Sequence, residues 1–183
     1  MTAMTTQESK IEFVRKKNLC PNIVFVDGMW GSGKSMIAPI LGSFPEVEKQ
    51  RMNHNFEYLA LLHHCGQIKS GAASSFLNIQ ADLDIFNSLI SREVNLRPSD
   101  HSGIFKNPKT FQYLKRLFKL GSQNIVDEIE QHQPWLQIMT HNVVQVTDIL
   151  FQTFGHRMKM VVMARHPLYM IEHWYNYIER VGT

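Results

Sequence analysis

Apolar residues along this chain follow two spacings. In residues 22–28 (NIVFVDG) and 158–164 (MKMVVMA) they form short uninterrupted runs, rich in branched residues in the first case. Such runs are typical of strands that are buried on both faces of a parallel sheet. A third run, WLQIMTH at residues 135–141, predicts a shorter strand that ends in a polar pair.

Elsewhere the apolar residues recur every three or four positions, which predicts helices with one apolar face. These segments are residues 34–44, 56–68, 71–94 (one long helix or a broken pair), 111–135 on either side of Gly121, 143–155 and 167–180. In the last segment the predicted apolar face consists of Met170, Ile171, Trp174, Tyr175 and Ile178. Residues 95–110 carry two prolines and predict a loop.

The order of these elements predicts an α/β fold with three layers and a central parallel sheet. We expect a single domain over residues 1–183, with a helical insertion at about residues 70–133. Three strands are few for such a sheet. Either further strands escape the pattern, or the chain stops before the natural end of the fold.

Composition narrows the class of protein. Of 183 residues, 44% are hydrophobic and 19% are charged, as in ordinary globular proteins. A net charge of +3 is too small to indicate nucleic-acid binding. No apolar run approaches the roughly 20 residues of a membrane span, and the polar N-terminus lacks the apolar core of a signal peptide. With only Cys20 and Cys65, whose spacing suits neither a metal nor a disulfide framework, we expect reduced thiols and a cytoplasmic location.

The segment GMWGSGKS, residues 28–35, matches the phosphate-binding pattern G-x-x-x-x-G-K-[ST] between a predicted strand and a predicted helix. Its glycines permit a backbone that turns successive N–H groups towards an anion, and the helix adds its positive end. The side chains of the lysine and the serine then reach phosphate oxygens or magnesium. The predicted anion-binding residues are Gly28, Gly31, Ser32, Gly33, Lys34, Ser35 and Met36, which makes the fold P-loop NTPase-like.

Kinases and ATPases usually carry an acidic residue at the end of a second strand to orient magnesium. Here the second strong strand is followed by Arg165. This arginine either binds a second anionic group of the ligand or pairs with an acid on the surface. Trp30 either stacks on an adenine or packs on the domain surface. The loop with Arg97, Asp100 and His101 either covers an acceptor pocket or is a plain connection.

Two further stretches resemble the P-loop sulfotransferases, which use 3′-phosphoadenosine-5′-phosphosulfate as donor. VVMARHPLYMIEHWYNY, residues 161–177, is similar to the family's 3′-phosphate-binding segment, so the resemblance implies that role for Arg165 and His173. The family has serine at the second position, but an imidazole N–H also donates to phosphate. Thr140 and His141 match a family triplet whose lysine is replaced here by methionine. The resemblance implies that His141 is the general base; from the residues alone it could equally be a histidine at a strand end that bonds to the backbone.

The resemblance thus implies sulfuryl transfer to a hydroxyl or amine of a small-molecule or carbohydrate acceptor, with Lys34 and His141 catalytic and no metal. The family's loop usually reads Lys-Ser-Gly-Thr, whereas this chain has the kinase-like Gly-Ser-Gly-Lys-Ser. Two alternatives therefore stay open: a small-molecule kinase that uses ATP with magnesium, and a non-catalytic nucleotide-binding protein.

Overall fold

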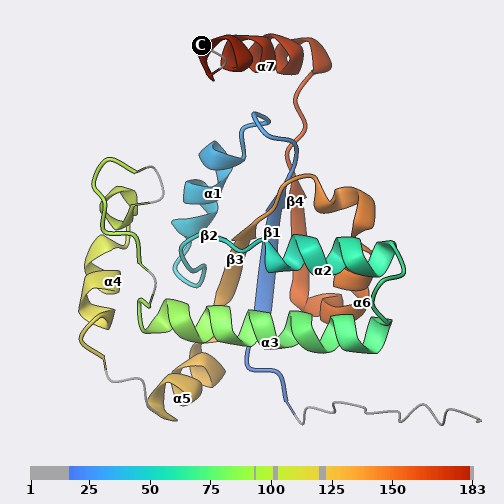
Figure 1. Cartoon of the computed structure of the whole chain (residues 1–183). Helices are drawn as coiled ribbons and strands as arrows, with labels where there is room; N and C mark the ends of the chain where they lie inside the picture. The colour runs from blue at the N-terminus through green and yellow to red at the C-terminus, as the bar shows by residue number, and fades with distance from the viewer. Residues whose placement is uncertain (1–16, 93, 101–102, 120–122, 182–183) are drawn as a thin grey trace, which may run out of the picture.

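The computed structural model describes residues 17–92, 94–100, 103–119 and 123–181. It contains a four-stranded sheet of β1 (Asn22–Asp27), β2 (Arg51–Met52), β3 (Trp135–Met139) and β4 (Met158–Val162) in the order β2-β3-β1-β4 (Figure 1). Every pairing is parallel, so the predicted α/β fold with a parallel sheet is confirmed. The sequence missed β2, because a strand of two residues has no readable period. Residues 1–16, His101 and Gly121, on which some predictions rest, lie outside the described ranges.

The helices follow the predicted segments closely. They are α1 (Lys34–Gly42), α2 (Asn55–His64), α3 (Ser70–Leu89), α4 (Thr110–Arg116), α5 (Gln123–His132), α6 (Asp148–Phe154) and α7 (Pro167–Val181), with short 3-10 turns η1 (Ile104–Lys106), η2 (Val143–Val146) and η3 (Gly155–Arg157). The ambiguous segment 71–94 is one long helix that ends at Leu89. The single helix expected over 143–155 is wrong in its first turn, which is the 3-10 turn η2. None of the helices in the described ranges offers an apolar stretch of membrane-spanning length.

Helices cover both faces of the sheet, which gives three layers. On one face α1 contacts β1 and β3, and the Gln137 side-chain amide donates to the Ala38 carbonyl over 2.9 Å. On the other face, inward side chains of the strands join those of α2, α3 and α6 in the main core. The rings of Phe25, Phe56 and Phe154 meet there, with centroids 5.5 to 6.3 Å apart. Because successive strand residues point to opposite faces, β1 is buried between the layers.

A buried ion pair fixes the chain that leads into β2. Glu48 accepts two hydrogen bonds from the Arg116 guanidinium, of 2.6 and 3.0 Å, and a third of 2.7 Å from the Tyr113 hydroxyl. All three side chains are buried. Burial, with the adjacent Glu48 charge, raises the pKa of Tyr113 far above its ordinary value, so the phenol stays a donor. The network attaches α4 to the segment that carries β2.

Helix α7 stands away from the rest of the molecule (Figure 1). Only Met170 of its predicted apolar face is buried, whereas Ile171, Tyr175 and Ile178 are more than 60% exposed. The apolar stripe of α7 is therefore present, but it does not face a core among the described residues. The helix instead contacts the loop that follows β1.

Candidate functional site

The carboxyl ends of the four strands lie along one edge of the sheet, because all strands are parallel. Three of these strands lead into a segment that the sequence singled out: the glycine-rich loop (residues 28–35) follows β1, His141 follows β3 and Arg165 follows β4. His54, which the sequence analysis did not single out, follows β2. In open α/β sheets ligands bind at this edge, at the strand where the chain changes from one side of the sheet to the other. Here that strand is β1, with β2 and β3 on one side and β4 on the other.

The glycine-rich loop has the backbone that the sequence motif requires. Gly28, Gly31 and Gly33 have φ angles of 142°, 85° and 103°, a range that residues with a Cβ rarely adopt. At Gly28 a Cβ would also lie 2.4 Å from the Met163 carbonyl oxygen, so glycine is required there twice over. Gly33 caps the N-terminus of α1, whose first residue is Lys34. The predicted strand–loop–helix arrangement is thus present.

Lys34 is buried beneath this loop, and its ammonium group donates to the Gly28 carbonyl. Burial lowers the pKa of Lys34, while the charges of Asp27 and Glu57 oppose that shift. The Ser32 hydroxyl is buried and lacks a hydrogen-bond partner among the described residues. Ser35 and Met36 are exposed in the first turn of α1. The loop therefore presents a cation, an orphaned hydroxyl and a helix N-terminus together, a set suited to an anion.

Arg165 and His173 lie against the same loop. The Arg165 guanidinium donates to the Gly31 carbonyl over 3.3 Å, and its charge lies 5.9 Å from the centre of the Tyr169 ring. The His173 imidazole lies so close that a Cβ on Gly31 would be 2.5 Å from its Cδ2. The hydrogen bond found for Arg165 goes to a carbonyl and not to a surface acid.

Trp30 connects the glycine-rich loop to α7. Its ring meets the Tyr177 ring edge to face, with centroids 4.1 Å apart, and the Trp174 indole donates to its carbonyl over 3.0 Å. Trp30 was expected either to stack on an adenine or to pack on the domain surface, and in the structure it packs against α7. These contacts hold α7, and with it His173, over the loop.

Asp27 closes the base of the site. Its side chain is fully buried at the end of β1, where one oxygen accepts from the Thr140 hydroxyl and the Val143 N–H, and the other from the Val144 N–H, over 2.9 to 3.0 Å. Each of these bonds fixes the segment that carries His141. Asp27 therefore ties the chain after β3 to the start of the glycine-rich loop.

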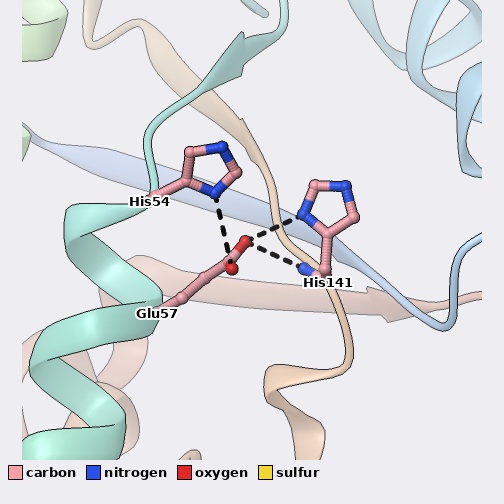
Figure 2. Close-up of side chains that lie close together, drawn as sticks. All are labelled: His54, Glu57 and His141. Atoms are coloured by element: carbon pink, nitrogen blue, oxygen red, sulfur yellow. Dashed lines mark hydrogen bonds and ion pairs between the residues drawn. The ribbon is translucent and has the colours of Figure 1, made fainter.

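His141 belongs to a cluster with His54 and Glu57 (Figure 2). Glu57 Oε1 lies 3.1 Å from His141 Nδ1 and accepts from the His141 backbone N–H over 2.9 Å, while Glu57 Oε2 lies 3.5 Å from His54 Nδ1. The two imidazole rings stack with centroids 5.7 Å apart. One ligand atom of each residue lies within 4.8 Å of the others, a spacing that a metal ion can bridge. The backbone N–H of Asn142 donates to the Gly28 carbonyl, so the cluster adjoins the loop.

Sequence reasoning missed His54 and Glu57. Their spacing of three places them on one side of the first turn of a helix, which is a weak signal in a single sequence. The missing information is β2, because without that strand nothing places the start of α2 beside the end of β3. The pairing Arg51↔Ile138 and Met52↔Met139 supplies that placement.

A cavity of about 290 Å³ adjoins the first turn of α1. Ser35 and Pro39 line it on the α1 side, Met139 from β3, and Asp100 and Asn107 from the loop after α3. This is the loop for which the sequence left open a covering role or a plain connection. Asp100 contributes to the wall of a cavity next to the glycine-rich loop.

The predicted residues Lys34, His141, Arg165 and His173 therefore lie at one edge of the sheet, although they are up to 139 positions apart in the chain. Comparisons of the chain with family models, with curated proteins and with solved structures found no match.

Proposed function

We propose that this protein transfers a sulfuryl group from 3′-phosphoadenosine-5′-phosphosulfate to a hydroxyl or amine acceptor, on a P-loop NTPase-like fold. The observation that carries the proposal is the 3.3 Å contact between the Arg165 guanidinium and the Gly31 carbonyl. A donor with phosphate groups at both ends of its ribose needs two cationic sites close together. Lys34 and Arg165 supply them, because they donate to two carbonyls of the same loop, those of Gly28 and Gly31.

In the proposed reaction Lys34 and the N–H groups of the glycine-rich loop hold the 5′-phosphosulfate. The acceptor oxygen or nitrogen attacks sulfur, a new bond forms between sulfur and that atom, and the bond from sulfur to the bridging oxygen of the phosphate breaks. The electron pair stays on that bridging oxygen, where the Lys34 ammonium stabilises the growing charge. The products are the sulfated acceptor and 3′,5′-ADP. Arg165 and His173 hold the 3′-phosphate throughout.

His141 receives the proton of the acceptor. An ionised Glu57 has only acceptor oxygens, so a neutral His141 donates its Nδ1–H to Glu57 over 3.1 Å. This tautomer leaves the Nε2 lone pair as the base. The backbone hydrogen bond from His141 to the same carboxylate oxygen supports the orientation.

One observation favours a second candidate, a small-molecule kinase that uses ATP with magnesium. The loop ends in Lys34 and an exposed Ser35, the pair that binds outer phosphates and magnesium in kinases. Against this candidate, Asp27 is the acid at the end of β1, and both of its oxygens accept hydrogen bonds from residues 140–144. These bonds use three of the roughly four acceptor sites of the carboxylate, which leaves little capacity to orient a magnesium ion.

Thermal unfolding with added nucleotide tests the proposal, because a ligand that binds the folded state raises the melting temperature. We expect 3′,5′-ADP without magnesium to protect the wild type, and Arg165→Ala to lose most of that protection. Arg180→Ala, near the other end of α7, is the matched control and should keep it. Protection by ATP with magnesium alone would replace the proposal with the kinase, and protection by neither would favour a non-catalytic protein.

A further inference from the structure

We infer that His54, Glu57 and His141 form a binding site for a divalent transition-metal ion of the zinc class. The inference rests on these three side chains and not on the proposed sulfuryl transfer. Two imidazoles with one carboxylate are a ligand set that zinc enzymes use, with a water in the fourth position. The resemblance to sulfotransferases led us to expect no metal. The ligands of this site come from two segments, since Glu57 and His141 are 84 positions apart.

The distances suit one ion. Zinc binds nitrogen and oxygen at about 2.0 to 2.2 Å, so two ligand atoms of a tetrahedral site lie about 3.4 Å apart. Glu57 Oε1 lies 3.1 Å from His141 Nδ1, and Glu57 Oε2 lies 3.5 Å from His54 Nδ1. Both histidines turn the same ring nitrogen towards the carboxylate (Figure 2). The carboxylate of Glu57 thus meets both ring nitrogens, and one ligand atom of each residue lies within 4.8 Å of the others.

Neighbouring groups hold the ligands in place. The His141 backbone N–H fixes one Glu57 oxygen over 2.9 Å. The His54 ring stacks on the rings of His141 and Tyr58, with centroids 5.7 and 6.1 Å apart. Outer contacts of this kind orient metal ligands and strengthen metal binding. Glu57 and His54 lie on one helical turn, so the start of α2 sets their separation.

The cluster is also open to solvent on one side. The His54 side chain is 48% exposed and that of His141 is 31% exposed, whereas Glu57 is 17% exposed. An ion can enter past His54, and a water can complete its coordination. Bound zinc would take the Nδ1 lone pair of His141 and add positive charge next to the glycine-rich loop. Metal binding and the general-base role of His141 are thus mutually exclusive.

Cobalt(II) and zinc(II) titrations of the chelator-treated full chain, without nucleotide, test this site. We expect one cobalt ion to bind per chain and to give the visible absorption of a four-coordinate site. Added zinc should displace the cobalt and abolish this absorption. His54→Ala and Glu57→Gln should each weaken zinc binding about tenfold or more, since the first removes a ligand and the second replaces a charged carboxylate by a neutral amide. The matched control is His63→Ala with His64→Ala, which removes two histidines from the other end of α2.

Each outcome decides the inference. Binding that is lost in His54→Ala and Glu57→Gln, and kept in the His63/His64 control, supports it. Equal binding by the wild type and the His54→Ala chain overturns it, as does loss in the control alone or absence of binding by the wild type. Far-ultraviolet circular dichroism of each variant verifies that it folds. Because nucleotide is absent, failure here leaves the 3′,5′-ADP test of the proposed function untouched.

Discussion

The glycine-rich loop and the cluster of His54, Glu57 and His141 adjoin each other at one edge of the sheet, but the chain builds them differently. The loop consists of eight consecutive residues, and the buried Asp27 directly before it anchors the neighbouring chain. The cluster joins the start of α2 to the end of β3, and its side chains are partly exposed. The loop is thus part of the packed structure, whereas the cluster lies at the surface of that structure. Substitutions in the two regions should therefore affect stability to very different degrees.

The largest effect is expected from Asp27→Ala, which disconnects the two regions. The substitution leaves the Thr140 hydroxyl and the N–H groups of Val143 and Val144 without their acceptor. We expect a loss of about 3–5 kcal/mol in the free energy of unfolding, measured by chemical denaturation. Asp127→Ala, an exposed acid on α5, is the control and should change it by less than about 0.5 kcal/mol. Equal values for the two variants would remove the anchoring role of Asp27.

Gly28→Ala should have the next largest effect. The new Cβ would lie 2.4 Å from the Met163 backbone oxygen, at a φ angle of 142°. We expect a cost of about 2–4 kcal/mol from strain and overpacking. Gly66→Ala is the comparison, because Gly66 has a milder positive φ, 70°, and no atom within 4 Å of an added Cβ. Its cost should be only about 1 kcal/mol. A comparable loss in both variants would mean that Met163 moves away freely.

Lys34→Met should change how stability depends on pH. Burial lowers the pKa of Lys34 in the folded chain, so the unfolded chain binds this proton more tightly. Protonation therefore favours unfolding, and stability gains as pH rises from the folded pKa towards the ordinary lysine value. Burial also lowers the pKa of Lys49 and that of Lys109. Chemical denaturation across alkaline pH therefore compares wild type with Lys34→Met, because their difference in stability isolates the contribution of Lys34. At pH values below the folded pKa of Lys34, the Lys34→Met variant should be more stable than the wild type. A less stable variant at those pH values would contradict the claim that burying the charged Lys34 destabilises the folded chain.

The smallest effect is expected from Glu57→Gln in the cluster. Glu57 loses its charge but keeps its shape and one acceptor oxygen for the His141 N–H. Since both histidines are partly exposed, we expect a change below about 1 kcal/mol in the free energy of unfolding. A loss as large as that of Asp27→Ala would mean that the cluster supports the fold and would end the contrast between the two regions.

Local patterns predicted most of the elements. The run at residues 22–28 and the glycines after it are β1 and its loop, and residues 71–94 are largely one helix. The wrong or missed elements are those whose structure depends on contacts with residues far away in the chain. The first turn after Asn142 is a 3-10 turn whose N–H groups bind Asp27, and the missed strand β2 is defined by its pairing with β3.

For the candidate site, the sequence by itself determined the glycine-rich loop, because backbone angles and the helix start depend on residues next to each other. It also marked Arg165, His141 and His173, through a resemblance. Only the tertiary structure decided that these three lie beside the loop and that Glu57 and His54 join His141. Side chains that are far apart in sequence meet through strand order and register, and the two-residue pairing of β2 with β3 leaves no local pattern from which the cluster could be predicted.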